Sequence, residues 1–191
     1  MTDTQTYFCP MLSKSKYVRG TQCHKSLWLY KHKKHLREIS ASQQAIFDSG
    51  TNAGLLAQEL FPNGIDASEG EDWPNFQVAR KTKELIQQGV TTIYEATFVY
   101  DDVLVAVDIL VKSSEGWHAY EVKSSTNVKD THFVDGSIQY YVIAGSGIDI
   151  KSFSMVTINK EYVRKGDIVV EDLFNKTDIT DEVCDLQSGL S

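Results

Sequence analysis

The spacing of hydrophobic and polar positions changes near residue 90 and divides the chain into a helical part and a strand-rich part. Before this point, apolar residues recur three and four positions apart, which predicts helices over residues 42–61 and 75–88. After it, residues 90–100 alternate, and residues 103–111 are almost continuously apolar. Both patterns are typical of β-strands, and the second is typical of a strand buried on both faces. The chain is therefore predicted to have an α/β fold.

Short turns between the predicted strands make neighbouring strands pair. Asp101 and Asp102 form the first turn, and residues 113–116 form the second, before a strand over residues 117–123. Helices followed by the order β-β-β-α-β predict a mixed central sheet flanked by helices. The other predicted elements are helices near 13–20 and 26–36, a helix over 130–144, strands over 152–158 and 168–170, and a helix that begins near 178.

Each of the two long helices before residue 90 has an apolar stripe that is predicted to face inward. Small residues in the first stripe predict that another element approaches closely there. The first stripe consists of Ile46, Gly50, Ala53, Ala57, Leu60 and Phe61, and the second consists of Phe76, Ala79, Leu85 and Ile86.

Length and composition fit a single globular domain. The chain has 191 residues, of which 41% are hydrophobic and 24% are charged. It contains no apolar run of about 18 residues, so we expect no membrane span, and we see no signal peptide. Three widely spaced cysteines favour a cytoplasmic location over a disulfide framework. We expect a basic helical extension over 1–40, a core over 41–175, and over 176–191 the start of a helix or linker within a longer protein.

Charge is distributed unevenly along the chain, whose net charge of −7 argues against simple coating of nucleic acid. Residues 12–37 hold eight of the 19 Lys and Arg residues and no acid, and aromatic residues lie among them. Such a segment can hold a phosphate backbone, or it can be a solvated helix face whose apolar residues pack inward. On the first interpretation, the DNA-binding candidates are Lys14, Lys16, Arg19, Lys25 and Lys31.

Asp108 is the polar exception in the apolar strand VLVAVDILV. A buried carboxylate without a partner costs several kcal/mol or becomes protonated, so Asp108 needs a partner, and a cation is the simplest one. Glu121 and Lys123 share one face of the next predicted strand. If the turn between the strands is centred on Ser114 and Glu115, Asp108 lies opposite Glu121, with the two Cβ atoms about 5 Å apart.

Two carboxylates at that distance repel each other unless a divalent cation lies between them, and oxygen ligands suit Mg²⁺ or Mn²⁺. Lys123 would reach the same point and stabilise a hydroxide nucleophile or the charge on a phosphate. The alternative is a Glu–Lys pair on a solvated strand, with Asp108 bonded to a nearby hydroxyl. A Glu-x-Lys triplet is weak evidence alone, but its position opposite Asp108 favours the metal site.

These motifs in their order resemble the PD-(D/E)XK nuclease superfamily, in which a hairpin Asp is followed by Glu-x-Lys within an α-β-β-β-α-β order. Within it the chain is most similar to the RecB-like exonuclease branch, which includes CRISPR-associated and phage or recombination exonucleases. It is especially similar to the N-terminal part of a family of larger bacterial proteins. The similar stretches, which span most of the chain, are LSKSKYVRGTQCHKSLWLYKH, SGTNAGLLAQELFPNG, VAVDIL, AYEVKSS and SIQYYVIAGSG.

The resemblance implies a restriction-endonuclease-like core that cuts DNA, single- or double-stranded, at phosphodiester bonds with Mg²⁺ or Mn²⁺. It makes Asp108 and Glu121 metal ligands together with the backbone carbonyl of Val122. It makes Lys123 the catalytic lysine and Gln139 a residue that lines the site and the DNA. Further domains of a longer parent protein would be additional partners.

The chain departs from the family pattern at two places. A metal-binding His often follows a Gly by four residues in this branch, whereas Gly50 is followed by Gly54. The metal site would therefore be weaker, or water or Glu95 would complete it. Some relatives hold a [4Fe–4S] cluster with one early and three late cysteines, and here only Cys23 and Cys184 lie in such positions. An iron–sulfur cluster is therefore not expected in this chain alone. The competing hypotheses are an inactive nuclease fold that binds nucleic acid and a scaffold domain of a multidomain protein.

Overall fold

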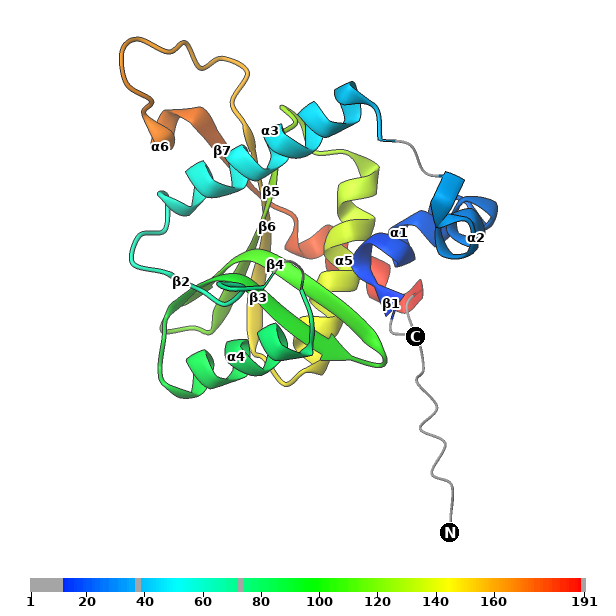
Figure 1. Ribbon diagram of the computed structural model, residues 1–191. Helices are drawn as coiled ribbons and strands as arrows, with labels where there is room; N and C mark the ends of the chain where they lie inside the picture. Colours follow the sequence, from blue (N-terminus) through cyan, green and yellow to red (C-terminus); the bar gives the residue numbers. More distant parts are fainter. Residues whose placement is uncertain (1–11, 37–38, 72–73, 190–191) are drawn as a thin grey trace.

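The computed structural model of the protein describes residues 12–36, 39–71 and 74–189 (Figure 1). These residues form a mixed α/β fold in which helices flank a seven-stranded sheet. The helices are α1 (Lys14–Gln22), α2 (His24–His32), the 3₁₀ helix η1 (Lys34–Leu36), α3 (Ala41–Gln58), α4 (Phe76–Gln87), α5 (Asp130–Gly145), α6 (Val170–Leu173), α7 (Thr180–Asp185) and the 3₁₀ helix η2 (Leu186–Gly189). The strands are β1 (Leu12–Ser13), β2 (Ile65–Asp66), β3 (Thr92–Tyr100), β4 (Val103–Lys112), β5 (Trp117–Lys123), β6 (Ile150–Ile158) and β7 (Phe174–Asp178).

The sheet has the strand order β2-β3-β4-β5-β6-β7, and β1 pairs with β4. Neighbouring strands are antiparallel in the pairs β3–β4, β4–β5 and β6–β7. They are parallel in the pairs β1–β4, β2–β3 and β5–β6. Helix α5 connects β5 to β6, because parallel neighbours need a long crossover rather than a hairpin.

Two hydrophobic cores lie on the two faces of the sheet. The larger core packs α4, α5 and α7 against the strands, and the smaller core packs α3 against them through Ala53 and Ala57. Ile109 and Leu110, which are successive residues of β4, belong to different cores. The prediction that this strand is buried on both faces is therefore confirmed. In Figure 1 the strands lie between α3 and α4.

The predicted helices and strands between residues 75 and 158 are confirmed, with ends that differ by at most two residues. Asp101 and Asp102 have φ angles of 50° and 57°, the left-handed values of a tight hairpin turn. The two-residue turn fixes how β3 pairs with β4. The order of these elements therefore follows from hydrophobic spacing and turn residues alone.

The prediction of a strand over residues 168–170 is wrong. Val170 begins the short helix α6, and the strand comes later, as β7. Strand β7 is polar and, after Phe174, exposed, because it lies at the edge of the sheet. An exposed edge strand has no hydrophobic alternation that a sequence pattern could show.

Parts of the two predicted inward stripes are also wrong. Ile46 in α3 is 64% exposed, and a Cβ at Gly50 would meet no atom within 4 Å. Only the second half of α3 packs on the sheet. In α4, Phe76 is 63% exposed, because the helix packs instead through Val78, Thr82 and Leu85.

The hydroxyl of Tyr94 fixes the end of α3 over β3. It donates to the carbonyl of Phe61 at 2.6 Å and accepts from the backbone N–H of Gly64 at 3.2 Å. Gly64 leaves room for the ring, because a Cβ there would lie 2.3 Å from Cζ of Tyr94. This contact therefore holds α3 above the residue that follows Tyr94 in β3, Glu95.

We expect Tyr94→Phe to lower the free energy of unfolding by about 1–2 kcal/mol, because it removes the donor to the partly buried carbonyl of Phe61. Urea unfolding followed by circular dichroism measures this change. Tyr141→Phe is the matched control, since its hydroxyl donates to Asp101 at an exposed position, and we expect a change below about 0.5 kcal/mol. Equal effects of the two substitutions would contradict the proposed anchor.

Candidate active site

In β3 and β4, the regular alternation of side chains between the two faces of the sheet is interrupted at one pair of opposed residues, Glu95 and Asp108. The ladder pairs Tyr94 with Ile109 and Ala96 with Val107, and it is interrupted between these pairs. In a regular strand, side chains two positions apart belong to the same core. Across this break the spacing is three, as for Ile93 with Ala96 and for Val107 with Leu110. Glu95 has a φ of 52° there, an unfavourable value for Glu. The break releases both carboxyl groups from the regular alternation of the sheet.

The predicted register between β4 and β5 is confirmed up to the break. Ile109 pairs with Tyr120 and Leu110 with Ala119, and continuing this register places Asp108 opposite Glu121. At that position Asp108 Oδ2 accepts the backbone N–H of Val122 at 2.6 Å. Because the N–H and C=O of a strand residue point to the same edge, the carbonyl of Val122 also faces the side of Asp108.

Glu121 is a buried carboxylate held by two ammonium groups. Its side chain is 3% exposed, and Oε1 accepts from Lys123 Nζ at 2.6 Å and from Lys14 Nζ at 2.7 Å. Burial alone would raise the pKa of Glu121, but the two lysines outweigh it and lower the pKa to about 2. The second oxygen, Oε2, is buried and has no hydrogen-bond partner in the described part of the chain.

Asp135 on α5 completes this cluster of charges. Its Oδ2 accepts from Lys123 at 2.6 Å, and its Oδ1 lies 3.6 Å from Lys14 Nζ. Burial opposes the charge of each lysine, but Glu121 and Asp135 outweigh burial and raise the pKa of both. We refer to Lys14, Glu121, Lys123 and Asp135 as the ion-pair cluster.

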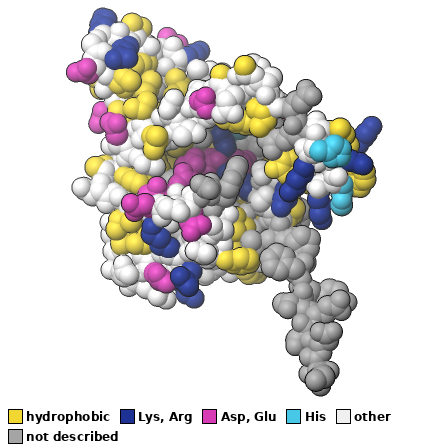
Figure 2. Space-filling model, viewed as in Figure 1, with side chains coloured by type: hydrophobic (Ala, Val, Ile, Leu, Met, Phe, Trp, Pro, Cys, Tyr) yellow, Lys and Arg dark blue, Asp and Glu magenta, His cyan; other side chains and the backbone are white. Residues whose placement is uncertain are grey.

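A pocket of about 320 Å³ opens beside the ion-pair cluster. Its floor contains Glu95, Asp108, Glu121 and Val122. Burial, followed by the charge of Glu121, raises the pKa of Asp108 to about 8 and that of Glu95 to about 7. Figure 2 shows acidic side chains at the bottom of a recess, with Lys, Arg and His side chains gathered over α2 to its right. The α3 residues that line the pocket are Gly50, Thr51, Gly54, Leu55 and Gln58.

The residues of the pocket fit a divalent cation, although they are not arranged as a complete ligand set. Among the described residues, no three His, Cys, Asp or Glu side chains form a group that could hold a metal ion as they stand. Lysines occupy one oxygen of Glu121, and the N–H of Val122 occupies one oxygen of Asp108. Oε2 of Glu121 has no partner among the described residues, and burial followed by the charge of Glu121 raises the pKa of Asp108 and Glu95, so a cation at this place would stabilise their charged forms. Carboxylate oxygens are also the ligands that Mg²⁺ and Mn²⁺ prefer.

The structure separates Lys14 from the other DNA-binding candidates. Lys14 lies in the ion-pair cluster, whereas Lys25 and Lys31 are exposed on α2. Lys16 and Arg19 are half-buried on α1. The guanidinium of Arg19 donates to Ser26 Oγ at 3.0 Å and lies 4.7 Å from the centre of the Tyr30 ring.

Gln139 lies on α5, one turn after Asp135, so the two share a face of the helix. It is fully buried, and both atoms of its amide group lack a hydrogen-bond partner in the described residues. The two cysteines in the described residues, Cys23 and Cys184, are both free and exposed.

Sequence reasoning missed the positions of Lys14 and Asp135 in the site. Lys14 is 107 residues from Glu121, and no local pattern connects them. Asp135 carried a weak signal, since it lies four residues before Gln139 on one helix face. The face of Glu95 was also hidden, because alternation cannot show a break within a strand.

No protein-family model matches the chain, and no curated protein matches its sequence. In the described ranges, no helix is both long enough and apolar enough to cross a bilayer. The function is therefore inferred from the residues of the pocket.

We expect Asp108→Asn to raise the free energy of unfolding in EDTA. The carboxyl has a pKa of about 8 in the folded protein and an ordinary value of 3.8, so the folded protein keeps a proton that the unfolded chain releases between these values. Wild-type stability therefore falls as the pH rises through this window, and the amide avoids the loss. Urea unfolding should show an advantage of about 1 kcal/mol or more near pH 8, which shrinks towards pH 4.

Asp149→Asn is the control for this prediction, because the side chain of Asp149 is 69% exposed. The stability of this variant should follow that of the wild type. If Asp108→Asn gives no advantage near pH 8, the pKa of Asp108 is not raised in the folded protein.

Proposed function

We propose that the protein is a metal-dependent nuclease that hydrolyses phosphodiester bonds of DNA with Mg²⁺ or Mn²⁺. One observation carries the proposal: Asp108 and Glu121 converge on a pocket beside Lys123, and Oε2 of Glu121 is buried without a partner among the described residues. A buried carboxylate oxygen without a partner is a position that a bound cation would satisfy. The order α4, β3, β4, β5, α5, β6 also supports a core of the PD-(D/E)XK type.

Some residues of the pocket would bind the cation, and Lys123 beside it would stabilise negative charge. Glu121 and Asp108, with the carbonyl of Val122 and the carboxylate of Glu95, would hold the cation. A divalent cation held there would activate water and polarise a phosphate. The N–H of Val122 donates to Oδ2 of Asp108 and so fixes the carboxyl group. The orientation of the other oxygen, Oδ1, is therefore set by the backbone and not by a flexible side chain.

Lys123 would stabilise the negative charge that develops on the phosphate. An ammonium group has three donors, and Glu121 and Asp135 accept two of them. The third donor remains for a phosphate oxygen. Asp135 holds Lys123 from α5, so the ammonium is positioned before substrate arrives.

The second candidate function is a nucleic-acid-binding module that retains this fold without cleavage. The observation that favours it is the double ion pair on Glu121, in which Lys14 and Lys123 already neutralise one carboxylate oxygen. Gly54, at the position of the family His, also lines the pocket without supplying a ligand. This module would bind DNA in a salt-dependent manner through α1 and α2 without turnover.

We expect Mn²⁺-dependent cleavage of labelled DNA that Asp108→Asn, Glu121→Gln and Lys123→Ala each slow by about 100-fold or more, because each removes a ligand or a charge at the reacting phosphate. Gel analysis of labelled oligonucleotides measures the rates. Glu115→Gln is the control, since this exposed turn carboxylate lies outside the pocket and should cleave at the wild-type rate. Wild-type rates in Asp108→Asn would rule out the nuclease assignment, and binding without cleavage in the wild type would favour the second candidate.

We expect Gly54→His to strengthen binding of Mn²⁺, because position 54 lines the carboxylate pocket and a Cβ there meets no atom within 4 Å. An added imidazole ligand should raise the affinity about tenfold or more, as measured by calorimetry. Gly54→Ala controls for the change in helix propensity, and Glu121→Gln should abolish binding in both backgrounds. Equal Mn²⁺ affinities for His and Ala at position 54 would contradict a cation in this pocket.

A further inference from the structure

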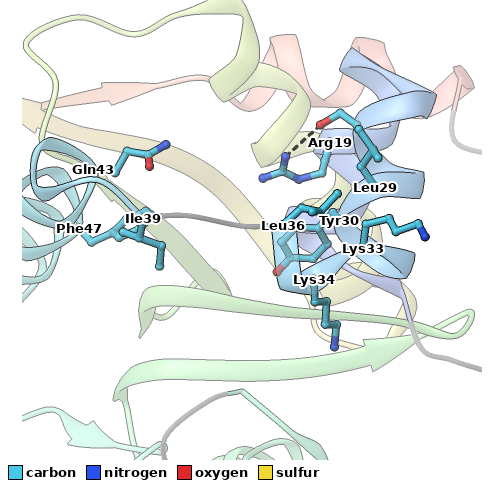
Figure 3. Close-up of a pocket in the computed structure, with 10 residues that line it drawn as sticks. Arg19, Leu29, Tyr30, Lys33, Lys34, Leu36, Ile39, Gln43 and Phe47 are labelled. Atoms are coloured by element: carbon cyan, nitrogen blue, oxygen red, sulfur yellow. Dashed lines mark hydrogen bonds between the residues drawn. The ribbon is translucent and has the colours of Figure 1, made fainter.

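A second hollow, of about 340 Å³, lies between α2, η1 and the beginning of α3 (Figure 3). We call it the α2–α3 pocket. One wall carries Ile39, Gln43 and Phe47, and Figure 3 shows these three facing Tyr30 and Leu36 across the hollow. The remaining lining residues are Arg19, Ser26, Leu29, Lys33 and Lys34.

The α2–α3 pocket combines apolar surface with positive charge. Leu36 is 65% exposed, and Ile39 and Phe47 are each 49% exposed, so large apolar side chains remain in contact with solvent. Three of the lining residues are cationic, and none of those in the described ranges is acidic. Apolar walls with cations at the edge suit a ligand that has flat apolar faces and negative charge.

Helix α3 connects this pocket to the candidate active site. Phe47 lines the α2–α3 pocket and Gly54 lines the carboxylate pocket. Seven residues span nearly two helical turns, so Phe47 and Gly54 lie on the same face of α3, about 10 Å apart along its axis. Gln43, Gly50 and Gln58 share this face and line one pocket or the other. The two hollows therefore follow one face of a single helix.

We propose that the α2–α3 pocket is a nucleobase-binding site that holds one unpaired base of a single strand of nucleic acid. The inference rests on the proposed function, because it takes the carboxylate pocket as the place where the same strand is cut. The ring of Phe47 offers a stacking surface, and stacking on an aromatic side chain accepts any base. Lys33 and Lys34 also line the pocket, and their charges would attract the phosphates next to the bound base.

The spacing of the two pockets fits a short piece of one strand. A stacked strand rises about 3.4 Å along its axis for each nucleotide, so the separation of about 10 Å between Phe47 and Gly54 along α3 corresponds to about three nucleotides. A base in an intact duplex is stacked between its neighbours and cannot enter the pocket without leaving the stack, which costs a few kcal/mol. The site therefore selects single-stranded nucleic acid or an unpaired end over a continuous duplex.

Binding of fluorescently labelled oligonucleotides in EDTA tests this inference, because no cleavage takes place without a divalent cation. We expect Phe47→Ala to weaken binding of an oligothymidine about tenfold or more, measured by fluorescence anisotropy, and to leave binding of a blunt duplex unchanged. Ile46→Ala is the matched control, since Ile46 is the adjacent residue of α3, is 64% exposed and does not line the α2–α3 pocket. It should bind both oligonucleotides as the wild type does.

Two further measurements separate base stacking from attraction of phosphates. A single abasic nucleotide, moved along the strand, should weaken binding at one or two adjacent positions and not at the others. Lys33→Ala should reduce the salt dependence of binding by about one phosphate contact, whereas Phe47→Ala should leave that dependence unchanged.

The inference is overturned if Phe47→Ala binds the single strand as the wild type does, or if it weakens single strand and duplex equally. It is also overturned if Ile46→Ala causes the same loss as Phe47→Ala. None of these outcomes depends on catalysis. A wild-type protein that fails to cleave DNA would refute the nuclease proposal, and the binding measurements would still test whether the α2–α3 pocket holds a base.

Discussion

The structure depends on one buried carboxylate and the two ammonium groups that neutralise it. Glu121 lies inside the sheet with 3% exposure, a position in which an uncompensated charge would cost several kcal/mol. Lys123 comes from the same strand, but Lys14 comes from α1 and Asp135 from α5. The charge balance of one residue therefore fixes the basic N-terminal helix against the crossover helix, and both against the strand that carries the candidate chemistry.

A second constraint is the break in the alternation of β3 and β4. If side chains alternated without interruption in both strands, the pleat of the sheet would decide to which face the side chains of Glu95 and Asp108 point. With the break, Glu95 takes an unfavourable φ of 52°, and the three carboxyl groups of Glu95, Asp108 and Glu121 share one pocket. An unfavourable backbone angle and raised pKa values thus occur together at this point, a combination that is common at functional sites.

Much of the fold could be predicted from the sequence because its strands are local. Two short turns fix the pairing of β3, β4 and β5, and the same register placed Asp108 opposite Glu121. The polar edge strand β7 was missed because it lacks a hydrophobic pattern. The positions of Lys14 and Asp135 depend on how the helices pack against the sheet. The direction of the Glu95 side chain depends on a backbone angle. The spacing of residues in the sequence shows neither the packing nor the angle.

The wrong prediction for α3 has the clearest functional meaning. Its three-and-four spacing predicts a face buried along its whole length, yet only Ala53 and Ala57 are buried. Phe47 and Gly54, which were not part of the predicted stripe, share the neighbouring face of α3, and each lines one of the two pockets. The spacing of apolar residues indicates which face of a helix avoids water, and it cannot distinguish a core from a ligand as the other partner. Under the two proposals, this face of α3 would be the wall along which a strand of nucleic acid reaches the carboxylates.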